Sequence, residues 1–139
     1  MSKPTYLRDT SDVPFLDNAR ILVKHTINKC SNEDKFAKRY RWCLTQKIVE
    51  SAVEMYANVK RANSVFVKTA KDYELRRYYQ KKAYAEVTAL TGLIDIAYEV
   101  FHKLDSDEIK YWTKLCVNCS NSIKNWIEAE IKKYAKVYD

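Results

Sequence analysis

The sequence predicts an all-α protein, and specifically a four-helix bundle with up-down-up-down connections. Its 139 residues include one glycine and two prolines, although the many turns of β and α/β folds rely on both residue types. Both prolines, Pro4 and Pro14, lie near the N-terminus, so neither interrupts a later helix. Apolar residues recur every three or four positions in four segments, as on one face of a helix. A chain of this length suits a single domain, residues 1–139.

The first predicted helix, residues 13–30, follows a polar arm over residues 1–12. Asp12 is placed to cap this helix, and Pro14 suits its first turn. Its expected buried stripe consists of Phe15, Ala19, Leu22, Val23 and Ile27.

The second predicted helix, residues 34–65, follows Ser31 to Asp34, a weaker form of the capping box. Polar side chains such as Lys47 and Glu54 fall on one face of this helix. The expected buried stripe on the other face consists of Leu44, Ile48, Ala52, Met55, Tyr56 and Val59.

The third predicted helix, residues 70–104, starts at a second capping pattern, Thr69 to Asp72. Gly92 lies inside it, where glycine costs about 1 kcal/mol against alanine, so we expect a close approach of two helices there. The expected buried stripe consists of Leu75, Tyr79, Ala83, Val87, Leu90, Ile94, Ala97, Phe101 and Leu104.

The fourth predicted helix, residues 106–137, starts at Ser106 and has acidic residues in its first turn, where the helix dipole favours them. Short loops place successive helices antiparallel, which closes the bundle. The expected stripe consists of Ile109, Trp112, Cys116, Ile123, Trp126, Ile127, Ile131 and Tyr134.

No catalytic constellation is recognisable, so we expect a protein that is not an enzyme and needs no cofactor. His25 and His102 fall on different helices and are interpreted as surface or core-edge residues. A single glycine excludes a glycine-rich phosphate loop. Cys116 and Cys119 have the spacing of a metal-binding pair, but they lie in mid-helix, and we interpret them as core residues.

The basic charge is concentrated in one third of the chain. The net charge is +7, yet residues 35–82 hold 13 Lys and Arg against 4 Asp and Glu. This asymmetry favours a localised anionic partner. The polar N-terminus resembles no signal peptide and no stretch reaches membrane-spanning length. We therefore expect a cytoplasmic protein with reduced thiols and no membrane partner.

Two clusters of cations alternate with aromatic residues, a pattern suited to phosphates and unpaired bases. In the third helix, Arg77 and Lys81 should point outward beside Tyr73, Gln80 and Tyr84. A solvated helix face is the competing interpretation for that cluster alone. The predicted nucleic-acid-binding residues are Arg76, Arg77, Lys81, Lys82, Lys38, Arg39, Arg41, Lys60 and Arg61.

Several of these residues carry a resemblance to a known family. Lys38 to Trp42, Ala62-Asn63 and Asp72 to Gln80 are its clearest parts. The chain after Pro14 resembles the accessory variability determinant proteins of diversity-generating retroelements, which are four-helix bundles. The similar bundle proteins encoded by intervening sequences in 23S ribosomal RNA genes belong to the same broad family.

The resemblance implies a ring-like homopentamer with a basic surface and no catalytic activity. It implies binding to the element's reverse transcriptase and to template RNA or cDNA, in support of mutagenic reverse transcription. The alternatives are an intervening-sequence bundle protein of unknown role and a protein–protein adaptor for acidic partners.

Overall fold

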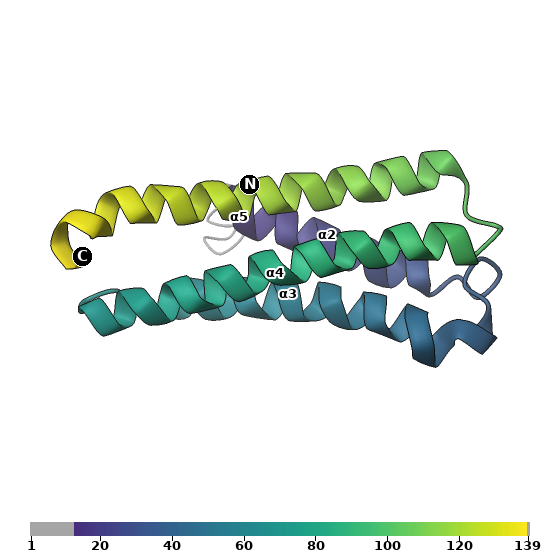
Figure 1. Ribbon diagram of the computed structural model, residues 1–139, viewed down its shortest axis with the longest axis horizontal. Helices are drawn as coiled ribbons and strands as arrows, with labels where there is room; N and C mark the ends of the chain where they lie inside the picture. The colour runs from purple at the N-terminus through teal and green to yellow at the C-terminus, as the bar shows by residue number, and fades with distance from the viewer. Residues whose placement is uncertain (1–12, 139) are drawn as a thin grey trace, which may run out of the picture.

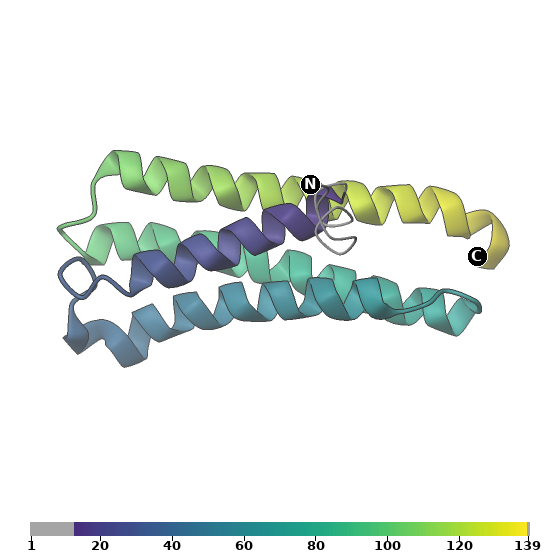
Figure 2. The same cartoon turned by 180° about the vertical axis from the view of Figure 1, so that it is seen from behind.

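The computed structural model describes residues 13–138, and over this range the chain forms helices and no strands. The four long helices are α2 (Pro14–Cys30), α3 (Gln46–Ser64), α4 (Ala70–Val100) and α5 (Ser106–Tyr138). Figures 1 and 2 show them as a rod in which successive helices run antiparallel. Each helix packs against its neighbours in the order α2, α3, α4, α5 and back to α2. The predicted four-helix bundle is therefore confirmed.

Helix α2 covers only part of the rod. It has 17 residues, against 31 in α4 and 33 in α5, so at about 1.5 Å per residue it spans roughly half their length. It begins beside the middle of α5 in Figure 2. There Phe15 stacks on Trp126, with ring centroids 3.6 Å apart. Val13 occupies the N-cap position, and the predicted cap, Asp12, lies outside the described residues.

The predicted start of the second helix at Asp34 is wrong. Residues 31–37 form turns, followed by a 3-10 turn (Lys38–Tyr40, η1), a π-helical turn (Arg41–Thr45, η2) and then α3. The Asn32 side chain accepts hydrogen bonds from the backbone N–H groups of Asp34 and Lys35, at 3.1 and 3.4 Å. This segment turns because Phe36 is buried against Phe101, with ring centroids 4.8 Å apart.

The third helix begins as predicted but ends earlier. Thr69 and Asp72 form a complete capping box, in which the side chain of each satisfies a free backbone N–H of the other. The helix stops at Val100 rather than Leu104, and Phe101 and Leu104 are buried in the connection to α5. Gly92 is exposed, with no atom within 4 Å of where a Cβ would lie, so the expected close approach is wrong.

The core follows the predicted stripes except at some positions near the helix ends. Ile27, Leu75 and Ile131 were expected inside, yet they are 42, 45 and 40 % exposed. Cys116 and Cys119 are buried, which confirms that they are core residues. Within residues 13–138 no helix has the length and apolarity needed to cross a membrane.

Glu108 ties together three segments at one end of the bundle. Its Oε1 accepts hydrogen bonds from Lys29 Nζ of α2, at 2.7 Å, and from Lys35 Nζ of the 31–37 turn, at 2.5 Å. Its Oε2 accepts from the backbone N–H of Asp105. The bonds from Lys29, then from Lys35 and the backbone, lower the pKa of Glu108 to about 2.

We predict that Glu108→Gln destabilises the protein by about 1–2 kcal/mol at neutral pH, allowing for screening by solvent. Because the pKa is lowered in the folded state, this contribution is complete above the unfolded pKa near 4.5 and is lost as pH falls toward 2. Urea unfolding of both proteins between pH 2 and 7 measures it. A difference in stability that stays constant down to pH 2 would contradict the assignment.

Candidate nucleic-acid interface

The nine predicted binding residues lie in two groups at opposite ends of the rod. Lys38, Arg39 and Arg41 precede α3, at the end where α4 runs into α5. The other six lie where α3 runs into α4, at the far end in Figure 1. Twenty residues of largely helical chain separate Arg41 from Arg61, or about 30 Å. The two groups therefore do not meet within one bundle.

Arg76 lies between α4 and α5 rather than on the open surface. Its side chain is 17 % exposed and its Nε lies 2.9 Å from Glu130 Oε1. The Nε–H does not point at that oxygen, so the contact is a charge pair and not a hydrogen bond. Its Nη1 donates to the carbonyl of Val65 at 3.2 Å, and its guanidinium carbon lies 5.5 Å from the centre of the Trp126 ring. We therefore assign Arg76 a role in packing.

Tyr73 and Gln80 are also buried, so their predicted place beside the outward cations is wrong. Each is 1 % exposed. Gln80 Nε2 donates to Glu130 Oε1 at 2.7 Å, and the Tyr73 ring packs on Tyr134, with centroids 5.1 Å apart. The first turns of α4 are rotated relative to the predicted stripe because they pack against these polar and aromatic groups of α5.

The rotation leaves three cations of α4 on the outside. We call Arg77, Lys81 and Lys82 the α4 basic face. Lys81 and Lys82 are exposed and Arg77 is partly buried. None of the three joins an ion pair among residues 13–138. Tyr78, 52 % exposed, lies beside them, with Lys82 Nζ 5.1 Å from its ring centre.

A lysine of α5, which the sequence analysis missed, joins this face. The Arg77 guanidinium lies 4.8 Å from the centre of the Tyr73 ring, which packs on Tyr134. Lys133 Nζ in turn lies 5.1 Å from the Tyr134 ring. The charge count over residues 35–82 could not include Lys133, because only the tertiary packing of Tyr73 on Tyr134 connects it to this part of α4.

The α3 side of this end is less favourable to an anion. Arg61 lies 3.4 Å from Glu54 Oε2 and donates to Asn58 Oδ1 at 3.0 Å, while Lys60 is exposed. Burial first, and then the negative charge of Glu54, raise the pKa of Glu86. This part of the surface therefore carries acidic groups among its cations.

The cations at the opposite end share one carboxylate. Glu33 Oε1 lies 3.0 Å from Arg41 Nη2, and its Oε2 lies 3.5 Å from Lys38 Nζ. All three side chains are at least 46 % exposed, and ion pairs this open add little stability. Arg39 is exposed, and its guanidinium lies 5.0 Å from the centre of the Tyr40 ring. These cations can exchange Glu33 for a phosphate at small cost.

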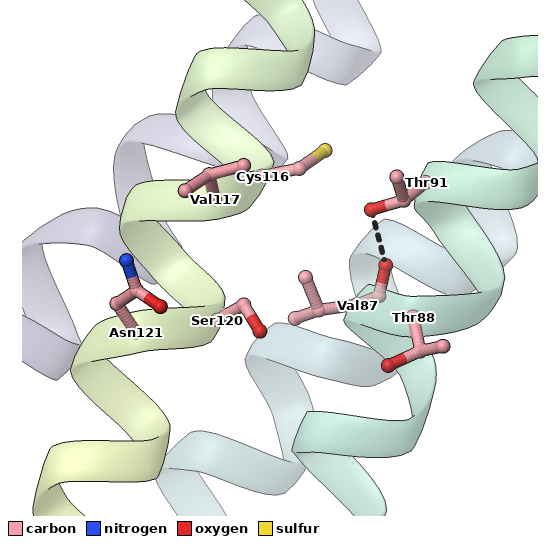
Figure 3. A pocket seen from close by; sticks show the side chains of 7 residues that line it. All are labelled: Val87, Thr88, Thr91, Cys116, Val117, Ser120 and Asn121. Carbon is pink, nitrogen blue, oxygen red and sulfur yellow. Dashed lines mark hydrogen bonds between the residues drawn. The ribbon is translucent and has the colours of Figure 1, made fainter.

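A hollow between α4 and α5 carries no charged group (Figure 3). Thr88 and Thr91 of α4 lie across it from Cys116 and Ser120 of α5, and the Thr91 hydroxyl donates to the Val87 carbonyl at 2.9 Å. Burial raises the pKa of the Cys116 thiol to about 11. The thiol is protonated at neutral pH, and a protonated thiol is a poor nucleophile.

His25 lies at the core edge of α2 as predicted, but the prediction that His102 lies on a helix is wrong, because α4 ends at Val100. His25 packs edge-on against Tyr111 and Trp112, and its pKa is lowered first by burial and then by Lys29. His102 is exposed in the loop before α5. Across the described range, no three His, Cys, Asp or Glu side chains are grouped closely enough to hold a metal ion.

No protein-family model, curated protein or solved structure matches this chain.

We predict that Glu130→Ala destabilises the protein by about 3 kcal/mol, because it leaves the largely buried Arg76 cation and the Gln80 amide without their partner. Glu128→Ala, at an exposed position of the same helix, should change stability by no more than about 0.5 kcal/mol. Chemical denaturation of both variants measures the difference. Equal losses would show that Glu130 does not determine the packing of α4 on α5.

Proposed function

We propose that this protein is a non-enzymatic accessory factor that binds nucleic acid through the α4 basic face. The observation that supports this is the placement of Arg77, Lys81 and Lys82. They lie on the outer side of α4 and join no ion pair among residues 13–138, beside the half-exposed ring of Tyr78.

The chemistry of this face suits a phosphate backbone. Guanidinium and ammonium groups bind phosphate oxygens, and each phosphate neutralised releases counterions into solution. Lys133 extends the cationic surface from α4 onto α5, so a strand lying across both helices meets charge from each. An exposed tyrosine ring offers a surface on which an unpaired base can stack.

The more specific proposal is an accessory factor of a diversity-generating retroelement. It would hold template RNA or cDNA on the reverse transcriptase and so support mutagenic copying. Support comes from the resemblance to that family, which is clearest over residues 35–104, and from the four-helix arrangement. The intervening-sequence bundle proteins share this fold and charge, and a reverse transcriptase that co-purifies with the protein would distinguish the two.

We predict that Arg77→Glu with Lys81→Glu weakens binding to a structured RNA by roughly tenfold at low salt and lowers the salt slope by about 2. Fluorescence anisotropy at salt concentrations from about 50 to about 300 mM measures both the affinity and its dependence on salt. Lys110→Glu, an exposed reversal near the start of α5, is the matched control. Failure of the unaltered protein to bind any RNA or DNA at low salt would refute the proposal.

A pull-down distinguishes the nucleic-acid function from that of a protein adaptor for acidic partners. Partners retained after RNase treatment, together with the absence of direct RNA binding, would favour the adaptor. Partners released by RNase favour the nucleic-acid function, because RNA then bridges the two.

The proposed assembly is a ring-like homopentamer. Apolar side chains remain on the flanks of the rod, among them Val53, Ile96 and Val117, which are 42, 47 and 48 % exposed. Contact between copies of the chain would remove such surface from water.

We predict that light scattering of the purified protein gives about five times the mass of one chain, since the 16.4 kDa protomer forms closed rings. High salt should leave this mass unchanged if the contacts are apolar. A monomer at all concentrations would contradict the ring.

A further inference from the structure

An apolar hollow lies at the end of the rod opposite the α4 basic face. It has a volume of about 300 Å³ and lies between the C-terminal turn of α2, the π-helical turn and the start of α3. Ile27, Cys30 and Val49 contribute apolar side chains, and Arg41, Trp42 and Thr45 of the π-helical turn complete it. The volume is at the lower end of the range for ligand pockets, which suits one flat ring system.

Among the residues that line this hollow, Trp42 is unusual in its exposure. Its side chain is 73 % exposed, whereas Trp112 and Trp126 are 0 and 8 % exposed. Leu44 of the same turn is buried instead. An indole left in water beside an apolar hollow offers a face on which a second aromatic ring can stack. Segments of π-helix occur frequently at functional sites.

One charged group of the hollow suits a nucleotide. Arg41 lines the hollow and pairs with the exposed carboxylate of Glu33, its one ion-pair partner among residues 13–138. A guanidinium binds phosphate in two-point fashion. The Thr45 hydroxyl is buried and has no hydrogen-bond partner among the described residues. An unsatisfied buried hydroxyl is costly, but this one is closed off from solvent and does not reach a ligand in the hollow.

We propose that this hollow takes one unpaired base of a single-stranded nucleic acid, stacked on Trp42, with the adjoining phosphate at Arg41. This inference rests on the proposed function. It adds that single strands bind at the end of the rod that holds the C-terminal turn of α2. A duplex keeps its bases stacked and paired, so it contacts the cations at this end but does not enter the hollow.

The first measurement is tryptophan fluorescence during titration with a single-stranded oligoadenylate and with a duplex RNA of equal length. We expect the single strand to quench the emission, because Trp42 is the exposed tryptophan, and the duplex to leave it nearly unchanged. Trp42→Phe keeps a ring for stacking but removes this emission, so it should abolish the quenching while most of the affinity remains.

The second measurement is affinity by anisotropy. Trp42→Ala should weaken single-strand binding by roughly tenfold and leave duplex binding unchanged. Glu33→Gln should strengthen single-strand binding, because it releases Arg41 and Lys38. Tyr98→Ala, which removes another exposed aromatic ring that lies outside both the hollow and the α4 basic face, is the matched control and should have no effect.

The outcomes separate this inference from the proposed function. If neither nucleic acid binds, the proposed function itself fails. If both bind but Trp42→Ala leaves single-strand affinity unchanged, the base site is refuted and the nucleic-acid function stands. If Trp42→Ala instead changes the mass measured by light scattering, a second copy of the chain covers the hollow, and the base site is likewise refuted.

Discussion

Burial of the Glu130 carboxylate between α4 and α5 is the interaction on which the exposed surface depends. One oxygen, Oε1, receives the amide of Gln80 at 2.7 Å and lies 2.9 Å from the Nε of Arg76. A carboxylate is stable in such a place only with partners of this kind. The two partners lie one helical turn apart on α4, so they fix the rotation of that helix about its own axis. Tyr73 then turns inward, and Arg77 and Lys81 turn away from the core.

Because of this rotation, the cations of α4 have different charged and aromatic neighbours. Lys82 lies one helical turn before Glu86, and its positive charge opposes the rise in the pKa of Glu86 that burial and Glu54 cause. Arg77 instead lies toward α5, where Tyr73, Tyr134 and the ammonium of Lys133 follow one another in contact. This α4–α5 contact, with the C-terminal part of α5, is where we propose that a phosphate backbone binds.

The other end of the rod is shaped by packing rather than by charge. Phe36 and Leu44 are both buried, and the chain between them passes through the 3-10 turn and into the π-helical turn. The π-helical turn carries Trp42 outward beside Arg41. About 30 Å of helix separates this site from the α4 basic face. A single partner that touches both within one bundle must therefore be extended over at least that length.

The sequence by itself determined the class of the fold, the number of helices and most of the core. Periodicity identifies these features because it depends on local geometry alone. The capping box at Thr69 and Asp72 is likewise local, and it was found from the sequence for the same reason. It also located the basic third of the chain and the burial of Cys116 and Cys119. Only the tertiary structure decided which cations are free. The buried partner of Arg76 lies 54 positions away at Glu130, and the helical start at Asp34 is lost to the packing of Phe36 on Phe101. Such contacts join residues far apart in the chain, and their energies exceed the local preferences that a sequence pattern records.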